Sequence, residues 1–225
     1  MTSRIEDTIR ACLANGRRIL DEDVSFCEFN DPPATAYFLT MIAQEEFAKG
    51  FLLALASRDV IPFDRHVLRA TRDHTCKQLL GMVMDHLQPD DEKWEQRIFS
   101  PLQATARQFP QRVADAISIF RFEKIGRWES SHWDYVQPPA YDRDACSIAE
   151  GRQDRRKQDA LYVRVANDGG VASVPAATRA EVRREIGRAD RFERCVLSVL
   201  DGEPWGFDDD AVREVFRKAF QTALA

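Results

Sequence analysis

The chain has 225 residues, of which 44% are hydrophobic and 31% are charged, a composition typical of a globular protein with a sizeable core. Its formal net charge of −5 disfavours a dedicated nucleic-acid-binding protein, although net charge does not describe local patches. No apolar run is long enough to span a bilayer, the N-terminal MTSRIEDTIR is charged, and the five cysteines form no C-x-x-C pair. We therefore expect a cytoplasmic protein with reduced thiols, no membrane contact and no zinc site.

Two helices are predicted before residue 60. Residues 4–26 have apolar side chains at helical spacing, and Asn15-Gly16 is the expected place for a kink in that helix. Ala34–Arg58 is the most apolar stretch, and its wide stripe predicts a core helix around which the rest of the chain packs. Glu45 lies on this stripe with Lys49 one turn later, so we expect these two side chains to pair at the edge of the core.

The next helix is expected over Asp64–Leu87, antiparallel to the core helix because the connection between them is short. If the turn is centred near residue 60, equal counting in both directions at about 1.5 Å per residue brings the middles of the two helices level. This geometry predicts one polar cluster within an apolar helical hairpin. Its expected members are Glu45, Glu46, Lys49, His74 and Lys77.

Beyond residue 90 the pattern predicts a helix over 94–109 that bends at Pro101, another that begins at Pro110, and a long loop over 130–151. Strand-forming residues occupy 160–165, a turn signal follows, and 171–174 is the expected partner strand. Because a two-stranded ribbon is marginal alone, we expect it to pack on the helices.

Two amphipathic helices close the chain, over Thr178–Leu200 and Asp209–Leu224. The arginines of the first lie mainly opposite its apolar side, where they either follow an RNA backbone or form a solvated face with the interleaved glutamates. The predicted fold class is mainly α, an antiparallel helical bundle with a short β-ribbon near 160–174. We expect a bundle core over 1–133, a loop or linker over 134–159, and the ribbon with both C-terminal helices over 160–225.

His74 is the candidate general acid or base of the predicted cluster, and Lys49 or Lys77 could stabilise developing negative charge. The alternative is a satisfied buried network that fixes the helical hairpin and does no chemistry. An R-x4-H spacing, in which ribonucleases use arginine to hold phosphate, occurs at Arg69…His74 and Arg127…His132. With arginine this abundant, about one such spacing is expected by chance, so the spacing alone is weak evidence.

A metal-dependent bundle enzyme is the third alternative, since Glu129…His132 has the E-x-x-H spacing of di-iron bundles. Such a site needs a second copy of the motif, and Glu45-Glu46 is followed by Lys49 where a ligand histidine would be required. We therefore expect neither a metal nor a cofactor.

Two sequence elements together resemble the AbiV family of bacterial abortive-infection proteins. One is A-x-Y-F-L-x-x-x-A-x-E-E-x-x-K at Ala34–Lys49, followed by H-x-x-K at His74–Lys77. The other is Lys157–Val163, similar to the K-x-x-x-L-Y-V-D element that follows the bundle in that family. The resemblance implies a HEPN-like helical bundle, a role in anti-phage defence, and growth or translation arrest on infection. It also implies a homodimer, because HEPN domains commonly dimerise, and many are ribonucleases whose R-x4-6-H motifs meet across the dimer.

Carried over residue by residue, the family motifs place Glu45, Glu46, Lys49, His74 and Lys77 at the candidate site. The chain departs from the pattern at Ala70, where catalytic HEPN motifs usually have a polar residue, and at Arg164, which replaces the family's aspartate. The first departure bears on ribonuclease activity.

We therefore expect a phage-defence protein that acts on RNA or translation, with His74 as acid or base and Arg69 as phosphate holder of a metal-independent endoribonuclease. The expected partners are a second copy, RNA and a phage-encoded trigger protein. The competing prediction is a non-catalytic helical protein that binds a phage or host partner. A His74 that is accessible to solvent beside Arg69 would favour the ribonuclease, and a sealed His74 would favour the interaction protein.

Overall fold

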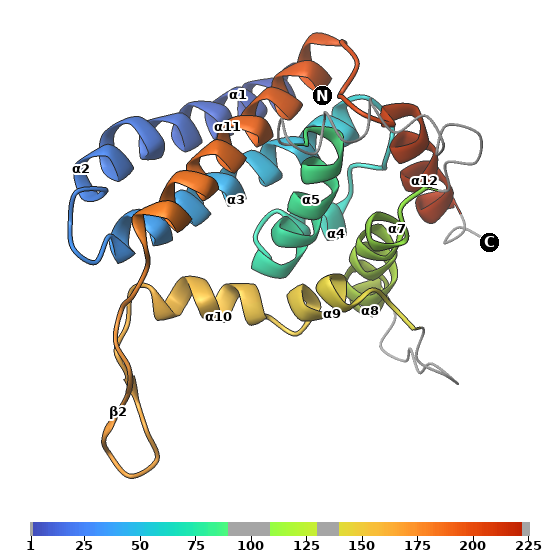
Figure 1. Ribbon diagram of the computed structural model, residues 1–225. Helices are drawn as coiled ribbons and strands as arrows, with labels where there is room; N and C mark the ends of the chain where they lie inside the picture. The colour runs from blue at the N-terminus through green and yellow to red at the C-terminus, as the bar shows by residue number, and fades with distance from the viewer. Residues whose placement is uncertain (1, 90–108, 130–139, 222–225) are drawn as a thin grey trace, which may run out of the picture.

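The computed structural model describes residues 2–89, 109–129 and 140–221, and it is mainly helical with one small antiparallel sheet. This confirms the predicted fold class. The long helix α3 (Ala34–Ser57) lies at the centre, with α1 (Thr2–Arg18) and α11 (Arg179–Asp201) packed along it (Figure 1). Because neighbours cover nearly all of its sides, α3 is buried over most of its length, as its apolar sequence requires.

The first predicted helix is confirmed, but its irregularity is not at Asn15-Gly16. The α-helix continues regularly through both residues to Arg18, passes through a π-helical turn, η1 (Ile19–Val24), and ends in the short α2 (Ser25–Cys27). Gly16 is instead a close-packing residue, since a Cβ there would lie 2.5 Å from Cε1 of Phe47. Its role is to let α1 approach α3.

The single helix expected over 64–87 is wrong, because it divides into α4 (Arg65–Ala70) and α5 (His74–Leu87). Each begins at an aspartate whose side chain accepts hydrogen bonds from the first-turn amides. Asp64 accepts from the amides of residues 66 and 67, and Asp73 accepts from the amide of residue 76. The second cap makes His74 the first residue of a helix.

A second group of helices covers α5. It comprises α7 (Gln111–Ser118), the π-helical turn η3 (Ile119–Ile125), α8 (Gly126–Glu129), α9 (Arg143–Ala149) and α10 (Arg152–Asp159). The helix from Pro110 is thus confirmed, whereas the loop expected over 134–159 is wrong from residue 143 onward. Asp142 caps α9 and left-handed Gly151 joins it to α10, signals that the polar composition of this stretch obscured. The helix predicted over 94–109 lies outside the described residues except at its end.

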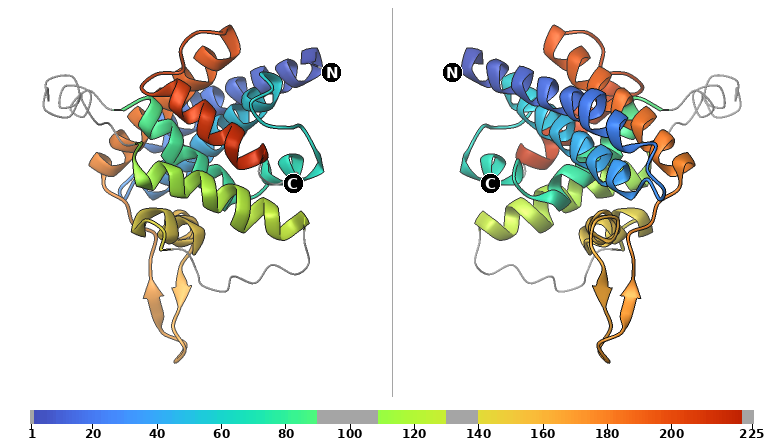
Figure 2. Two further views of the ribbon diagram at one scale, coloured as in Figure 1. Left: turned by 90° about the vertical axis from the view of Figure 1, so that its right-hand side faces the viewer. Right: turned by 90° about the vertical axis from the view of Figure 1, so that its left-hand side faces the viewer.

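The ribbon consists of β1 (Arg164–Val165) and β2 (Val171–Ser173), paired antiparallel with Arg164 opposite Ser173 and Val165 opposite Val171. It is shorter than predicted, and the expectation that it packs on the bundle is wrong. The ribbon extends away from the helices (Figures 1 and 2), and its valines are exposed. Only its base, where α10 ends and α11 begins, is anchored on the bundle.

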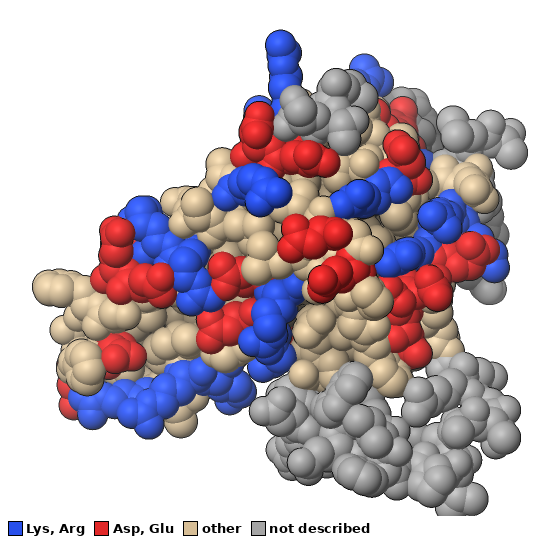
Figure 3. All heavy atoms as spheres, turned by 90° about the horizontal axis from the view of Figure 1, so that it is seen from above, with Lys and Arg blue, Asp and Glu red and all other residues tan. Residues whose placement is uncertain are grey.

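The two C-terminal helices are confirmed as α11 and α12 (Asp209–Gln221). Thr178 and Glu181 form a capping box at the start of α11. Arg188 and Arg191 depart from the outward direction expected of the α11 arginines, since both reach Asp85 on α5. The face seen from above carries both basic and acidic side chains, and some of the basic ones form a band along its lower left edge (Figure 3). Among the described residues, no helix combines the length and hydrophobicity needed to cross a membrane.

Candidate functional site

The centre of the candidate site is the carboxylate of Glu45, which is only 4% exposed in the middle of α3. Lys77 Nζ lies 2.9 Å from its Oε2, and Lys157 Nζ lies 2.7 Å from its Oε1. His74 Nδ1 contacts Oε2 at 2.5 Å, and the Gln78 amide donates to Oε1 at 3.4 Å. A buried carboxylate is costly unless it is paired, and this one has partners from two other helices.

The ionisation of Glu45 is set by these neighbours. Burial by itself would raise the pKa of the Glu45 carboxyl, but the ammonium groups of Lys77 and Lys157 outweigh burial and hold the pKa below its ordinary value. Glu45 is therefore an anion at neutral pH, and it acts as the acceptor for every donor around it.

His74 lies at the edge of this cluster, and half of its side-chain surface is exposed to solvent. The Asp73 cap starts α5 at His74 and places the imidazole above Glu45. Lys157 Nζ is 3.2 Å from the same Nδ1, but the Glu45 carboxylate is closer, so we assign the proton to Nδ1. Nε2 is then the nitrogen with a lone pair, as in sites where a carboxylate orients a histidine base.

Lys157 was not among the residues predicted for this cluster, yet it is the most buried of its cations, at 3% exposure. Its ammonium also contacts Asp154 Oδ1 at 2.8 Å, so the cluster extends onto α10. The signal that could have found it is the element Lys157–Val163, whose first residue is this lysine. The assumption that residues 134–159 form a loop concealed it.

Glu46 and Lys49 do not join the cluster, and the predicted Glu45–Lys49 pair is wrong. Lys49 Nζ contacts Glu46 Oε1 at 2.7 Å, and both side chains line a separate, largely apolar cleft of about 340 Å³ between α1, α3 and α4. Successive helical residues point about 100° apart, so Glu45 faces α5 and α10 while Glu46 faces the separate cleft between α1, α3 and α4. Glu45 forms its ion pairs with the buried ammonium groups of Lys77 and Lys157, and Lys49 pairs with Glu46 instead.

Arg69 does not contact His74 in this chain. Its guanidinium carbon lies 4.4 Å from the ring centroid of Trp128 on α8, a cation–π stack. The break between α4 and α5 separates the two members of the R-x4-H spacing. In the other occurrence of the spacing, Arg127 contacts Glu123 at 2.6 Å, and residue 132 lies outside the described part of the chain.

One group of described side chains has ligand atoms close enough to hold a metal ion: Glu45, His74 and Asp154, within 4.8 Å of one another. The Lys157 ammonium lies within 3.2 Å of each of these residues. In this arrangement a lysine cation already occupies the space a metal ion would need, so the donor set fits an ion-pair network better. Glu129, of the E-x-x-H spacing, contacts Arg121 at 2.9 Å.

A helical bundle in which three helices bring together a buried glutamate, two lysines and a histidine is consistent with the HEPN-like class. The family model for AbiV, a HEPN family, matches residues 4–194, and the chain belongs to this family. No curated protein and no solved structure matches the chain. The structure brings together the three sequence motifs that resemble the family. The first contributes Glu45, the second contributes His74 and Lys77, and the third contributes Lys157.

Proposed function

We propose that this abortive-infection family member defends against phage by cleaving RNA without a metal ion, with His74 as the proton-transfer residue. The observation that carries the proposal is the half-exposed imidazole of His74, whose Nδ1 contacts a buried, ionised glutamate. This leaves Nε2 available to a substrate. His74 is accessible to solvent, as expected of a catalytic histidine, but within one chain it does not lie beside Arg69, which was the other part of that expectation.

In the proposed reaction His74 Nε2 accepts the proton of a ribose 2′-hydroxyl, and the 2′-oxygen attacks the adjacent phosphorus. The bond from phosphorus to the 5′-oxygen breaks, and this oxygen takes up a proton from the His74 imidazolium, which gives a 2′,3′-cyclic phosphate and a 5′-hydroxyl end and restores the imidazole. Glu45 stabilises the imidazolium formed in the first step, and Lys77 and Lys157 hold Glu45 in place. These three are positioning residues, because they are buried and His74 is the member of the cluster that is exposed to a substrate.

Arg69 remains the proposed phosphate holder, but across a homodimer. Its guanidinium is exposed and stacks on Trp128, and within the described residues its N–H groups have no hydrogen-bond acceptor. The family resemblance implies that R-x4-6-H motifs meet across a dimer, so the arginine of one copy would serve the histidine of the other. RNA as substrate, a phage-encoded trigger protein and a location in the cytoplasm complete the proposal.

A second candidate function is a non-catalytic interaction protein. The observation in its favour is that both buried lysines are fully engaged by Glu45, so the cluster has the balanced composition of a structural network. In that case His74 only caps the network, and protection arises from binding a phage or host partner.

The two candidates differ in how His74→Ala behaves. We expect the folded variant to lose both protection of cells against phage and cleavage of total RNA by purified protein. His66→Ala is the matched control, because His66 lies on α4, where its ring contacts Arg65 outside the cluster. A folded His74→Ala protein that protects fully would exclude catalysis at His74. Wild type that protects without cutting RNA would favour the interaction protein.

A further inference from the structure

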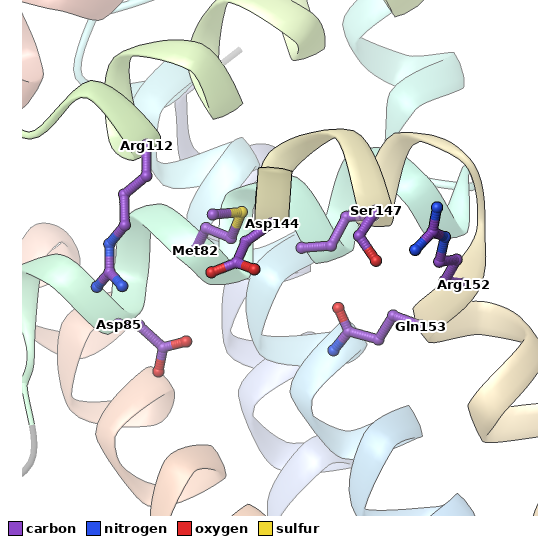
Figure 4. A pocket seen from close by; sticks show the side chains of 8 residues that line it. Met82, Asp85, Arg112, Asp144, Ser147, Arg152 and Gln153 are labelled. Atoms are coloured by element: carbon purple, nitrogen blue, oxygen red, sulfur yellow. The ribbon is translucent and has the colours of Figure 1, made fainter. Parts of the chain in front are cut away.

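A second polar cavity lies apart from the Glu45 cluster, between α5, α7, α9 and α10. It has a volume of about 430 Å³, within the range of small-molecule sites. The side chains that matter for its chemistry point into it from four helices (Figure 4): Met82, Asp85, Arg112, Asp144, Ser147 and Gln153. None of these residues has a part in the proposed proton transfer.

Several polar groups on its walls have no protein partner. Within the described segments, the side chains of Arg112, Ser147 and Gln153 make no hydrogen bond or ion pair, although all three are partly buried. These groups are therefore available to water or to a ligand. Together they offer a guanidinium, a hydroxyl and an amide to one occupant.

One wall of the cavity, at Arg112, favours an anionic group of the occupant. Asp85 is already neutralised by Arg188, whose Nη2 lies 2.7 Å from its carboxylate, and by Arg191 at 3.6 Å. Arg152 contacts Glu150 at 2.7 Å. Arg112 is therefore the cavity cation without a carboxylate partner in the described segments.

The remaining walls suit a planar ring that carries amino or hydroxyl groups. Met82 and the neighbouring Ile148 are buried and provide an apolar surface. The Asp144 carboxylate, which has no side-chain partner in the described segments, faces the same space (Figure 4) and accepts hydrogen bonds.

We propose that this cavity binds one nucleotide, with its phosphate on Arg112 and its base against Met82. The planar guanidinium matches phosphate geometry, Asp144 and Gln153 recognise base or ribose donors, and the cavity is large enough for one such unit. The source is either a free mononucleotide or one unit of an RNA strand.

The cavity is placed to serve the same strand as His74, and this part of the inference rests on the proposed function. Gln153 also lines a small gap that reaches Glu45 and Lys77, so α10 forms a wall shared by both sites. Met82 follows His74 by eight residues on α5, which corresponds to about 12 Å along the helix. When an RNA strand is bound with its scissile phosphate at His74, a nucleotide close to that phosphate would therefore lie in this cavity.

The first test measures binding of AMP, GMP, CMP and UMP to the full-length protein by calorimetry. We expect Arg112→Gln to weaken nucleotide binding by about tenfold or more, the loss of one charge-assisted contact. Arg143→Gln, an exposed arginine on α9 outside the cavity, should bind as wild type does. Absence of binding, equal binding by Arg112→Gln, or inorganic phosphate that binds as tightly as nucleotides would overturn the proposal.

The second test separates the two sources of the nucleotide. With a short single-stranded RNA as substrate, an RNA-binding cavity predicts that Arg112→Gln raises KM severalfold and leaves kcat unchanged. An unchanged KM, with mononucleotide binding lost, would assign the cavity to a free nucleotide. If wild type cleaves no RNA, the proposed function fails, and the calorimetric result still decides whether the cavity binds nucleotides.

Discussion

At the scale of single residues, the Glu45 cluster is balanced in charge. Two carboxylates, Glu45 and Asp154, face two ammonium groups, Lys77 and Lys157. Buried ion pairs of this kind contribute little net stability, but the removal of one partner leaves an uncompensated charge. The cluster is therefore sensitive to truncation even where its net contribution is small.

Lys157→Met tests this directly. It removes the most buried cation and leaves Glu45 short of one partner, so we expect the free energy of unfolding to fall by about 3 kcal/mol in urea titrations. Lys49→Met is the matched control, and because the Lys49–Glu46 pair is partly exposed, its loss should cost less than about 1 kcal/mol. Equal losses for the two variants would contradict the central role of Lys157.

The lowered pKa of Glu45 predicts how stability depends on pH. The unfolded chain takes up the proton near the ordinary value of 4.5, and the folded chain does so only at lower pH. The contribution of Glu45 is therefore fully present above that value and is lost as pH falls through the lowered pKa. Unfolding free energies of wild type and Glu45→Gln, measured from pH 7 to pH 3, should converge below about pH 4.5. A constant difference would contradict the prediction.

At the scale of elements, the break between α4 and α5 decides the character of the site. A continuous helix would place His74 in mid-helix, whereas the Asp73 cap makes it the first residue of α5. The aspartates were visible in the sequence, but the apolar periodicity continues across the break and hides it. Arg69 was separated from His74 by the same break and stacks on Trp128.

Gly16 is the second feature at the scale of elements, because it sets how closely α1 packs against α3. Gly16→Ala would place a Cβ against the buried Phe47 ring, and we expect a loss of about 1–3 kcal/mol from overpacking, offset in part by helix propensity. Gly187→Ala is the matched control on α11, since a Cβ there meets nothing closer than 4.0 Å. It should gain up to about 1 kcal/mol. Thermal unfolding measures both, and a stabilised Gly16→Ala protein would rule out the close contact.

At the scale of the whole molecule, the site exists because segments distant in the chain converge on α3. Lys157 is 112 residues from Glu45 in sequence, and the two are in hydrogen-bond contact. The face seen from above carries charges of both signs, with a band of basic side chains along its lower left edge (Figure 3).

The proposed homodimer is a prediction at this scale. Light scattering coupled to gel filtration should give twice the chain mass of 25.8 kDa. If Arg69 of one copy serves His74 of the other, mixing inactive Arg69→Ala and His74→Ala proteins should restore part of the RNA cleavage, since some heterodimers contain one intact site. A monomer, or no recovery on mixing, would contradict the shared site.

The sequence by itself determined the helical class, the core helix, the level pairing of Glu45 with His74 and Lys77, and the family. These follow from apolar periodicity, a short connection and motifs, all of which are local in the chain. Only the tertiary structure decided that Glu45 pairs with Lys157 and not with Lys49, that Arg69 lies elsewhere, and that the ribbon stands free of the bundle. These contacts form between residues that are far apart in the sequence and meet only when the helices pack. Which buried charge lies nearest to which counter-charge is set by that packing, and no local sequence pattern encodes it.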